Sequence, residues 1–149
     1  TRLRKLDEGQ YDAIVLAAAG LLRLGLGERI RTRLTQLLPC AGQGALGIEV
    51  LSARPEVAAA VRQLAHLPTW LACAAERAVS RRLGGSCSVP LAAHATPLGD
   101  GRWQLRAAFG MPDGRLLRAQ AEAALPDLAE AERLGEAVAE DLRRAGALV

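Results

Sequence analysis

Cys87 is the side chain in this sequence whose surroundings best suit covalent chemistry. It lies in Gly84-Gly85-Ser86-Cys87-Ser88-Val89-Pro90, a run of small residues between an expected helix end and an expected strand start. Small neighbours leave a sulfur accessible, and the thiolate form of such a cysteine is a good nucleophile. A lone loop cysteine can equally be incidental, so these residues alone leave both interpretations open.

The other cysteines and the two histidines indicate no further chemistry. Cys40, Cys73 and Cys87 cannot all pair and form no Cys-x-x-Cys motif, which favours a reducing compartment such as the cytoplasm. Cys73 lies inside an expected helix and is interpreted as a packing residue. Together with His66, a helix-end residue, and His94, a strand residue, the cysteines lack the spacing of zinc ligands, so no metal site is expected.

The glycine-rich segment Gly42-Gln43-Gly44-Ala45-Leu46-Gly47 matches the spelling G-x-G-x-x-G. A dinucleotide site needs those glycines after a strand and at the start of a helix, so that the helix N-terminus meets the pyrophosphate. Here the expected strand follows the glycines instead. The segment is therefore interpreted as a turn or hinge in which the backbone needs glycine.

Basic residues exceed acidic ones by 19 to 16, a net charge of +3, and Lys5 is the only lysine among them. An arginine presents a planar fork that can bind a carboxylate or phosphate through two hydrogen bonds. The arginines are scattered among the acids and form no basic stripe, and no stacking aromatic pair occurs on an expected strand, so we expect no nucleic-acid binding. No apolar run is long enough to cross a membrane.

The elements that must position these residues fall into two groups. Residues 67–149 predict a helix over about 69–83, three antiparallel strands over 89–96, 102–110 and 115–123, and a closing helix over about 127–145. Leu71, Ala75, Ala78 and Val79 form the apolar side of the first helix, and Glu76 is expected to face elsewhere. Residues 1–66 predict only a short helix or turn over 1–10, strands over 13–19 and 48–51, and a helix over 55–65.

Most of the chain resembles the hydroxymethylbilane synthase family, also called porphobilinogen deaminases. The residues that carry the resemblance occur in family order, and Cys87 falls at the cofactor-attachment position. They are Thr1-Arg2-Leu3, Lys5-Leu6-Asp7, Tyr11-Asp12-Ala13-Ile14, Ala18-Ala19-Gly20-Leu21, Arg23-Leu24-Gly25-Leu26, Gly42-Gln43-Gly44-Ala45, Gly47-Ile48-Glu49, Glu76-Arg77, Leu83 and Gly85-Ser86-Cys87-Ser88-Val89-Pro90-Leu91-Ala92. Many members have two glycines before the cysteine where this chain has Gly85-Ser86, a small change.

The resemblance implies a fold with both α/β and α+β parts. Family members have three domains, two of them similar to periplasmic binding proteins. On that map residues 1–43 would be the latter part of domain two, 44–66 a segment that returns to domain one together with a hinge, and 67–149 the complete C-terminal α+β domain. That domain would hold a three-stranded antiparallel sheet flanked by helices.

The resemblance also implies a cytoplasmic transferase of porphyrin and heme biosynthesis. Such enzymes condense four porphobilinogen molecules into the linear tetrapyrrole hydroxymethylbilane and release ammonia. Cys87 would hold a dipyrromethane cofactor through a thioether, and Arg2 and Arg23 would bind carboxylates of the cofactor or substrate. Gln43 would lie at a hinge or at the site, while Arg4 has no such match and is left as a surface residue.

The catalytic aspartate of the family lies outside this chain, so this portion alone is expected to be inactive. The chain starts with Thr1 and its only methionine is Met111, which favours a piece of a longer protein. The resemblance implies that the intact protein is monomeric. The alternative is a non-catalytic α+β module whose residues 1–66 associate with a partner or with a second copy.

Overall fold

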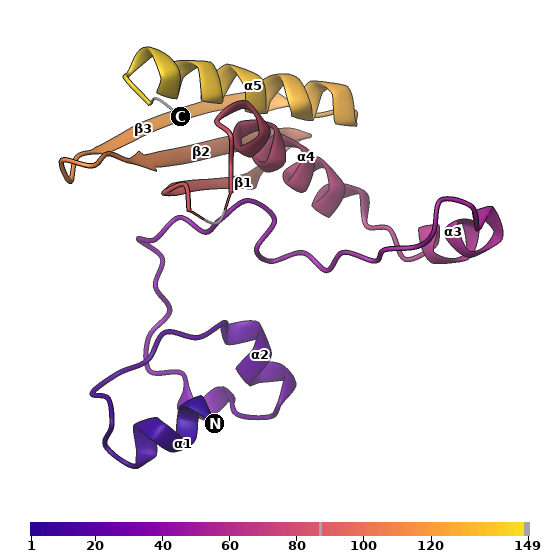
Figure 1. Ribbon diagram of the computed structural model, residues 1–149. Coiled ribbons are helices and arrows are strands. Elements are labelled where there is room, and N and C mark those ends of the chain that lie inside the picture. The colour runs from indigo at the N-terminus through magenta and orange to yellow at the C-terminus, as the bar shows by residue number, and fades with distance from the viewer. Residues whose placement is uncertain (87, 148–149) are drawn as a thin grey trace. The chain divides into compact units, whose positions relative to one another are not determined.

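The structure is a computed structural model that describes residues 1–86 and 88–147. The chain divides into two compact units, residues 1–37 and residues 38–149. Figure 1 labels the α-helices and strands, and all helices and strands follow in chain order. These are α1 (Arg2–Asp7), α2 (Ala18–Arg23), the 3-10 helix η1 (Gly27–Arg29), α3 (Pro55–Arg62), α4 (Leu67–Arg82), β1 (Leu91–Gly99), β2 (Arg102–Gly110), β3 (Leu116–Ala124) and α5 (Leu128–Arg144).

The first unit contains short helices joined by loops. The strand predicted over 13–19 is wrong, because residues 13–17 have no regular structure and α2 begins at Ala18. A strand needs a neighbour to bond its backbone groups, and the structure describes no strand within residues 1–37. The helix predicted near the N-terminus is confirmed as α1, and an ion pair joins Arg29 of η1 to Asp7 of α1.

The second unit is built on a three-stranded antiparallel sheet in the order β1-β2-β3. Its two connections are tight turns, as the glycine-containing sequences predict. Asp100 and its neighbour Gly101 both have positive φ, 51° and 73°, at the β1–β2 turn. At the β2–β3 turn the Met111 N–H donates to the Arg115 carbonyl at 2.8 Å, and Gly114 takes a φ of 84°.

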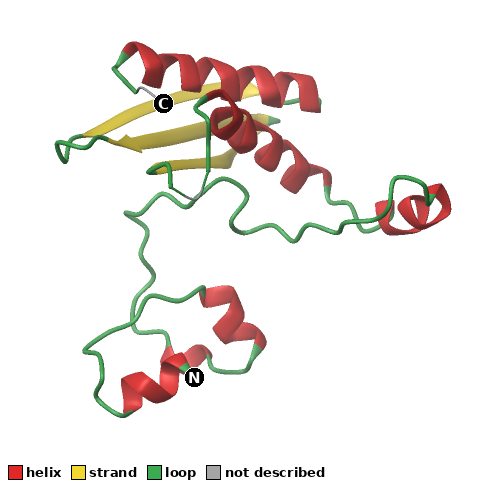
Figure 2. Ribbon diagram, in the orientation of Figure 1, coloured by secondary structure: helices red, strands yellow, loops and turns green. Residues whose placement is uncertain are grey.

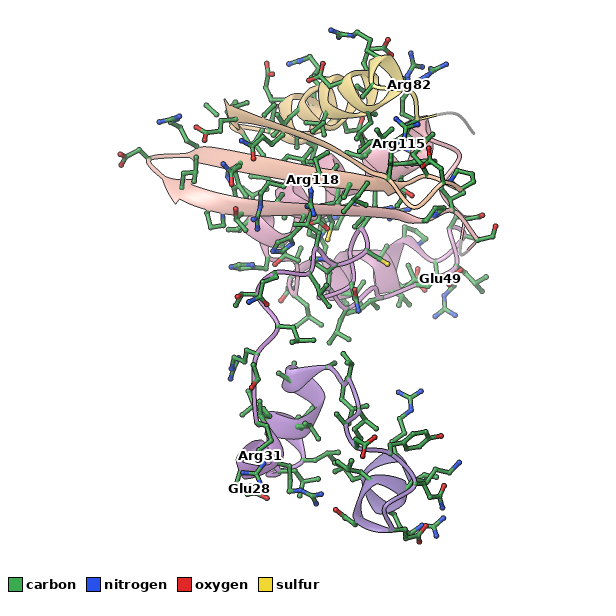
Figure 3. The ribbon with its side chains drawn as sticks, turned by 90° about the vertical axis from the view of Figure 1, so that its left-hand side faces the viewer. Glu28, Arg31, Glu49, Arg82, Arg115 and Arg118 are labelled. Atoms are coloured by element: carbon green, nitrogen blue, oxygen red, sulfur yellow. The ribbon has the colours of Figure 1, made fainter. Side chains whose placement is uncertain are left out.

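Helices α4 and α5 pack on each other and on one face of this sheet (Figure 1). The core lies between them and is made mostly of aliphatic side chains, among which Leu83, Leu105, Val138 and Leu142 are almost fully buried. On β3, Leu117, Ala119, Ala121 and Ala123 pack against that core, while the alternate residues are exposed. Arg118, one of the exposed residues, therefore points away from the helices (Figure 3).

The helix ends follow local chemistry. Asp127 caps α5 because its Oδ1 accepts a hydrogen bond from the Glu130 N–H at 2.9 Å. Gly146, with a φ of 108°, ends the same helix, and the Ala147 N–H donates back to the Leu142 carbonyl. None of the described helices combines the length and the apolar character that crossing a membrane requires.

Residues 38–66 contribute one helix, α3, which starts at Pro55 as predicted, and otherwise form loops (Figure 2). The strand predicted over 48–51 is wrong, because the structure assigns no strand there. Leu46 is 92% exposed and Leu51 is 74% exposed, so this segment buries little of its apolar surface within the described chain. Only its start is joined to the sheet, where the Ala93 N–H of β1 donates to the Pro39 carbonyl at 3.1 Å.

Candidate functional site

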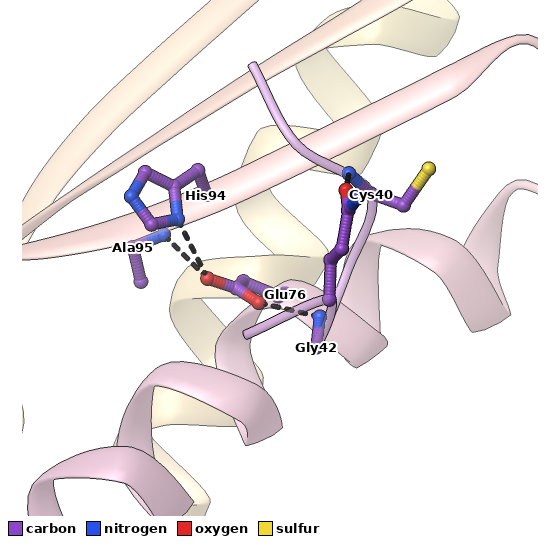
Figure 4. A network of polar contacts seen from close by, with 6 residues as sticks. Cys40, Gly42, Glu76, His94 and Ala95 are labelled. Atoms are coloured by element: carbon purple, nitrogen blue, oxygen red, sulfur yellow. Dashed lines mark hydrogen bonds and ion pairs between the residues drawn. The ribbon is translucent and has the colours of Figure 1, made fainter. Parts of the chain in front are cut away.

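A buried carboxylate connects three parts of the second unit, residues 38–149 (Figure 4). Glu76 of α4 is only 5% exposed. Its Oε2 accepts a hydrogen bond from the Gly42 N–H at 2.7 Å, and its Oε1 accepts one from the Ala95 N–H at 2.9 Å. The same Oε1 lies 3.2 Å from Nδ1 of His94. One acid therefore joins helix α4, strand β1 and the glycine-rich turn.

The prediction that Glu76 faces away from the apolar side of its helix is wrong. Position 76 lies at the border of the apolar stripe, and its neighbours one turn away are the small residues Ala72 and Ser80. A buried charge needs hydrogen-bond partners, and the backbone of β1 and of the turn supplies them. Small residues on both sides of an acid were the sequence signal that could have identified this position.

The turn at the Gly-Gln-Gly segment is confirmed. Gly42 has a φ of 70°, a conformation that favours glycine. The Gln43 N–H donates to the Cys40 carbonyl, and the Gln43 side chain returns to accept from the Cys40 N–H, both at 3.1 Å. Gln43 is exposed. Gln43, the predicted hinge or site residue, therefore lies in a turn that its own side chain helps to close. Glu76 binds the same turn through the Gly42 N–H.

Cys87, the predicted cofactor residue, lies outside the described residues, but the segments on both sides of it are described. Before it, the Gly85 N–H donates to the Ser80 carbonyl of α4 at 2.7 Å. A Cβ on Gly85 would lie 2.0 Å from Ser80 Oγ and 2.8 Å from the Ser80 carbonyl oxygen, so any larger residue would force the loop or α4 to shift. After it, the Ser88 hydroxyl lies 2.8 Å from that of Ser86.

Arg2 and Arg23, the predicted carboxylate-binding residues, lie in the first unit on α1 and α2. Both are exposed. Neither takes part in an ion pair with any residue that the structure describes. Arg4, in contrast, pairs with Glu8 one helical turn away at 2.7 Å, as a surface residue would. The helices α1 and α2 do not pack against each other.

The remaining cysteines differ in environment. Burial, with a smaller effect from the Glu76 charge, raises the pKa of the Cys73 thiol, so that thiol stays protonated at neutral pH. This agrees with its interpretation as a packing residue. Cys40 is exposed beside the turn. Within the described residues no group of three or more His, Cys, Asp or Glu side chains could hold a metal ion.

Comparison with known families gives two matches in chain order. Residues 1–59 match the family model described as "Porphobilinogen deaminase, dipyromethane cofactor binding domain". Residues 70–144 match the model described as "Porphobilinogen deaminase, C-terminal domain". The second match covers the sheet, α5 and nearly all of α4.

Curated relatives agree with these matches. The chain is 60% identical to a porphobilinogen deaminase of Albidiferax ferrireducens, over 97% of this chain and 47% of the relative. It is 56% identical to one of Paraburkholderia phytofirmans, over 99% of this chain and 44% of the relative. It is 50% identical to one of Chromobacterium violaceum, again over 99% of this chain and 47% of the relative. The chain therefore spans about half the length of the curated relatives it matches.

Proposed function

This chain belongs to the porphobilinogen deaminase family, and we propose that it supplies the cofactor-bearing portion of an enzyme that makes hydroxymethylbilane. In this reaction four porphobilinogen molecules are joined head to tail and ammonia is released at each step. The observation that carries the proposal is 60% identity over nearly the whole chain to a porphobilinogen deaminase. The two family models, matched in order, support it.

Cys87 is the proposed attachment residue for dipyrromethane. The described residues around it fit a covalently bound group, because Gly84, Gly85, Ser86 and Ser88 are all small and exposed. The Gly85 N–H bond to the Ser80 carbonyl holds the described start of this loop against α4. When bound, dipyrromethane supplies the primer to which further pyrroles are added.

Arg2 and Arg23 are the proposed carboxylate-binding residues. Porphobilinogen carries acetate and propionate groups, so a growing polypyrrole accumulates negative charge. Exposed guanidinium groups that no described acid neutralises are suited to bind those carboxylates through paired hydrogen bonds. Gln43 is proposed to lie at the hinge or at the site, since its turn connects the segments before and after it.

The proposed domain map follows the family. Residues 1–43 form the latter part of a periplasmic-binding-protein-like domain two, 44–66 return to domain one, and 67–149 form the C-terminal domain. The exposed Leu46 and Leu51 support the middle assignment, because a segment that completes another domain shows its apolar residues when alone. The intact protein is proposed to be a cytoplasmic monomer. We place the catalytic aspartate outside this chain, so the chain alone makes no product.

A second candidate is a non-catalytic module that associates with a partner or a second copy. The same exposed apolar residues in 44–66 favour it, since surface of this kind is buried by association. In that case residues 67–149 would be the stable part. The two candidates differ in what the exposed apolar side chains of residues 1–66 pack against in the intact protein.

A chimera tests the first candidate. Residues 1–149 replace the matching portion of the Albidiferax ferrireducens relative, and the product is incubated with porphobilinogen. We expect hydroxymethylbilane from the chimera and none from the 149-residue chain alone. Trypsin is suited to locate the cofactor, because it places Cys40, Cys73 and Cys87 in separate peptides, 34–62, 63–77 and 83–102. The added mass is expected on peptide 83–102.

Cys87→Ser is expected to abolish the added mass and the activity, whereas the matched variants Cys40→Ser and Cys73→Ala retain both. An adduct on either other peptide would overturn the assignment of Cys87. Product from the isolated chain would overturn the placement of the aspartate. An inactive chimera, together with a dimer of the isolated chain in size-exclusion chromatography, would favour the non-catalytic candidate.

A further inference from the structure

Glu76 is the buried acid to which the proposed function assigns no role. It is 5% exposed, and its three hydrogen-bond partners come from two segments other than its own helix. Two of these partners, Ala95 and His94, belong to β1. The third, Gly42, belongs to the turn that carries Gln43.

We propose that the Glu76 carboxylate holds the Cys40–Gln43 turn against α4 and β1 and so positions Gln43. Glu76 is then a positioning residue that acts through the backbone of Gly42 (Figure 4). Its importance for the reaction rests on the proposed function, because Gln43 matters only if it lies at the hinge or the site. The attachment of the turn does not depend on that function.

The two carboxylate oxygens of Glu76 accept hydrogen bonds from different backbone donors. Oε1 faces the Ala95 N–H, which lies on a strand residue only 5% exposed and has no access to water as a substitute acceptor. Oε2 faces the Gly42 N–H on a half-buried turn. A glutamine side chain at position 76 would have only one acceptor oxygen. We expect that oxygen to accept from the Ala95 N–H, which is the more deeply buried of the two donors. The NH2 group of that glutamine would then face the Gly42 N–H, and two donors repel each other.

A second contact limits how far the turn can move when this bond is lost. The Pro39 carbonyl accepts from the Ala93 N–H at 3.1 Å, two residues along β1 from Ala95. Position 39 therefore stays on the strand while residues 40–43 are released. The effect of losing the Glu76 bond is expected to be local to the turn.

Nuclear magnetic resonance on the 149-residue chain tests the proposal. In the unmodified chain, a scalar coupling across the hydrogen bond is expected between the Gly42 amide nitrogen and the side-chain carboxyl carbon of Glu76. In Glu76→Gln, exchange of the Gly42 amide hydrogen is expected to accelerate about tenfold or more, the effect of losing a hydrogen bond to a charged group. The amides of β2 and α5 are expected to keep their protection.

His94→Ala is the matched control, because it removes one contact of the same carboxylate and leaves both backbone bonds. Gly42 exchange is expected to be unchanged in it. Absence of the coupling in the unmodified chain, unchanged Gly42 exchange in Glu76→Gln, or equal loss of protection throughout the sheet would each overturn the proposal. If Glu76→Gln does not fold, the coupling in the unmodified chain still decides. No readout involves cofactor or activity, so an inactive chimera would leave this test unaffected.

Discussion

Gly85→Ala is expected to destabilise the loop that leads to Cys87. The new Cβ would lie 2.0 Å from Ser80 Oγ and 2.8 Å from the Ser80 carbonyl oxygen, well inside normal contact distances. The hydroxyl can avoid the methyl group only by leaving its present rotamer, which adds to the cost. The carbonyl belongs to α4 and accepts the Gly85 N–H at 2.7 Å, so the loop must shift and that bond must weaken.

The magnitude follows from two opposing effects. Forcing a methyl group into a filled space costs about 1–3 kcal/mol. Replacing glycine by alanine restricts the unfolded chain and returns about 0.4–1 kcal/mol where the backbone conformation permits. Gly85 does not have the positive φ that would add strain. The expected loss in the free energy of unfolding is therefore about 1–2 kcal/mol.

Urea unfolding of four chains measures this loss and its cause: the unmodified chain, Gly85→Ala, Ser80→Ala and the double variant. Removing the Ser80 hydroxyl relieves the shortest contact but leaves the carbonyl in place. The double variant is thus expected to recover about half of the loss, a coupling of at least 0.5 kcal/mol between the two sites. A stability unchanged by Gly85→Ala, or additive effects in the double variant, would refute this account of the loop.

Two further predictions concern the core and the cysteines. Gly135→Ala on α5 is expected to lower the free energy of unfolding by about 1–3 kcal/mol, because its Cβ would lie 2.2 Å from the Ala75 carbonyl oxygen of α4. Gly47→Ala, with no atom within 4 Å of the added carbon, serves as the control in the same urea experiment, and equal effects would contradict the close helix contact. Burial raises the pKa of Cys73, so its alkylation by iodoacetamide at pH 7–8 is expected to be slower than that of the exposed Cys40, as read from their tryptic peptides. Since the pKa of Cys73 is raised in the folded state, its contribution to stability is fully present below the ordinary thiol pKa and is lost as the pH rises from that value through the raised pKa. Equal alkylation rates would disprove the burial.

The helices and strands of residues 67–147 were predictable because the sequence patterns that indicate them are local. Glycine turns separate three alternating strands, and the apolar spacing of residues 128–142 matches one helix face. The start of α4 differs from its prediction by two residues, since Pro68 is accepted in the first helical turn. Most contacts of these elements lie within residues 67–147, and the bonds from Ala93 to Pro39 and from Gly42 to Glu76 are additions to them.

The strands predicted over 13–19 and 48–51 failed for the opposite reason. Their apolar residues fit a strand, but a strand is stable only beside another one, and the chain supplies no neighbour for either among the described residues. Glu76 was missed because helical spacing gives only the direction of a side chain. That its acceptors would meet donors at Ala95 and Gly42, which are far away in the sequence, cannot be deduced from spacing.

The contacts at Ala93 and Ala95 also close the outer edge of the sheet to strand addition. An incoming strand would have to displace the Pro39 carbonyl from one N–H and the Glu76 carboxylate from the other before it could form a ladder with β1. At the opposite edge, β3 exposes Arg118, Gln120 and Glu122, and charged residues on an edge strand discourage cross-chain β pairing. Self-association of this chain by extension of the sheet is therefore disfavoured at both edges, and a second copy would have to bind through another surface.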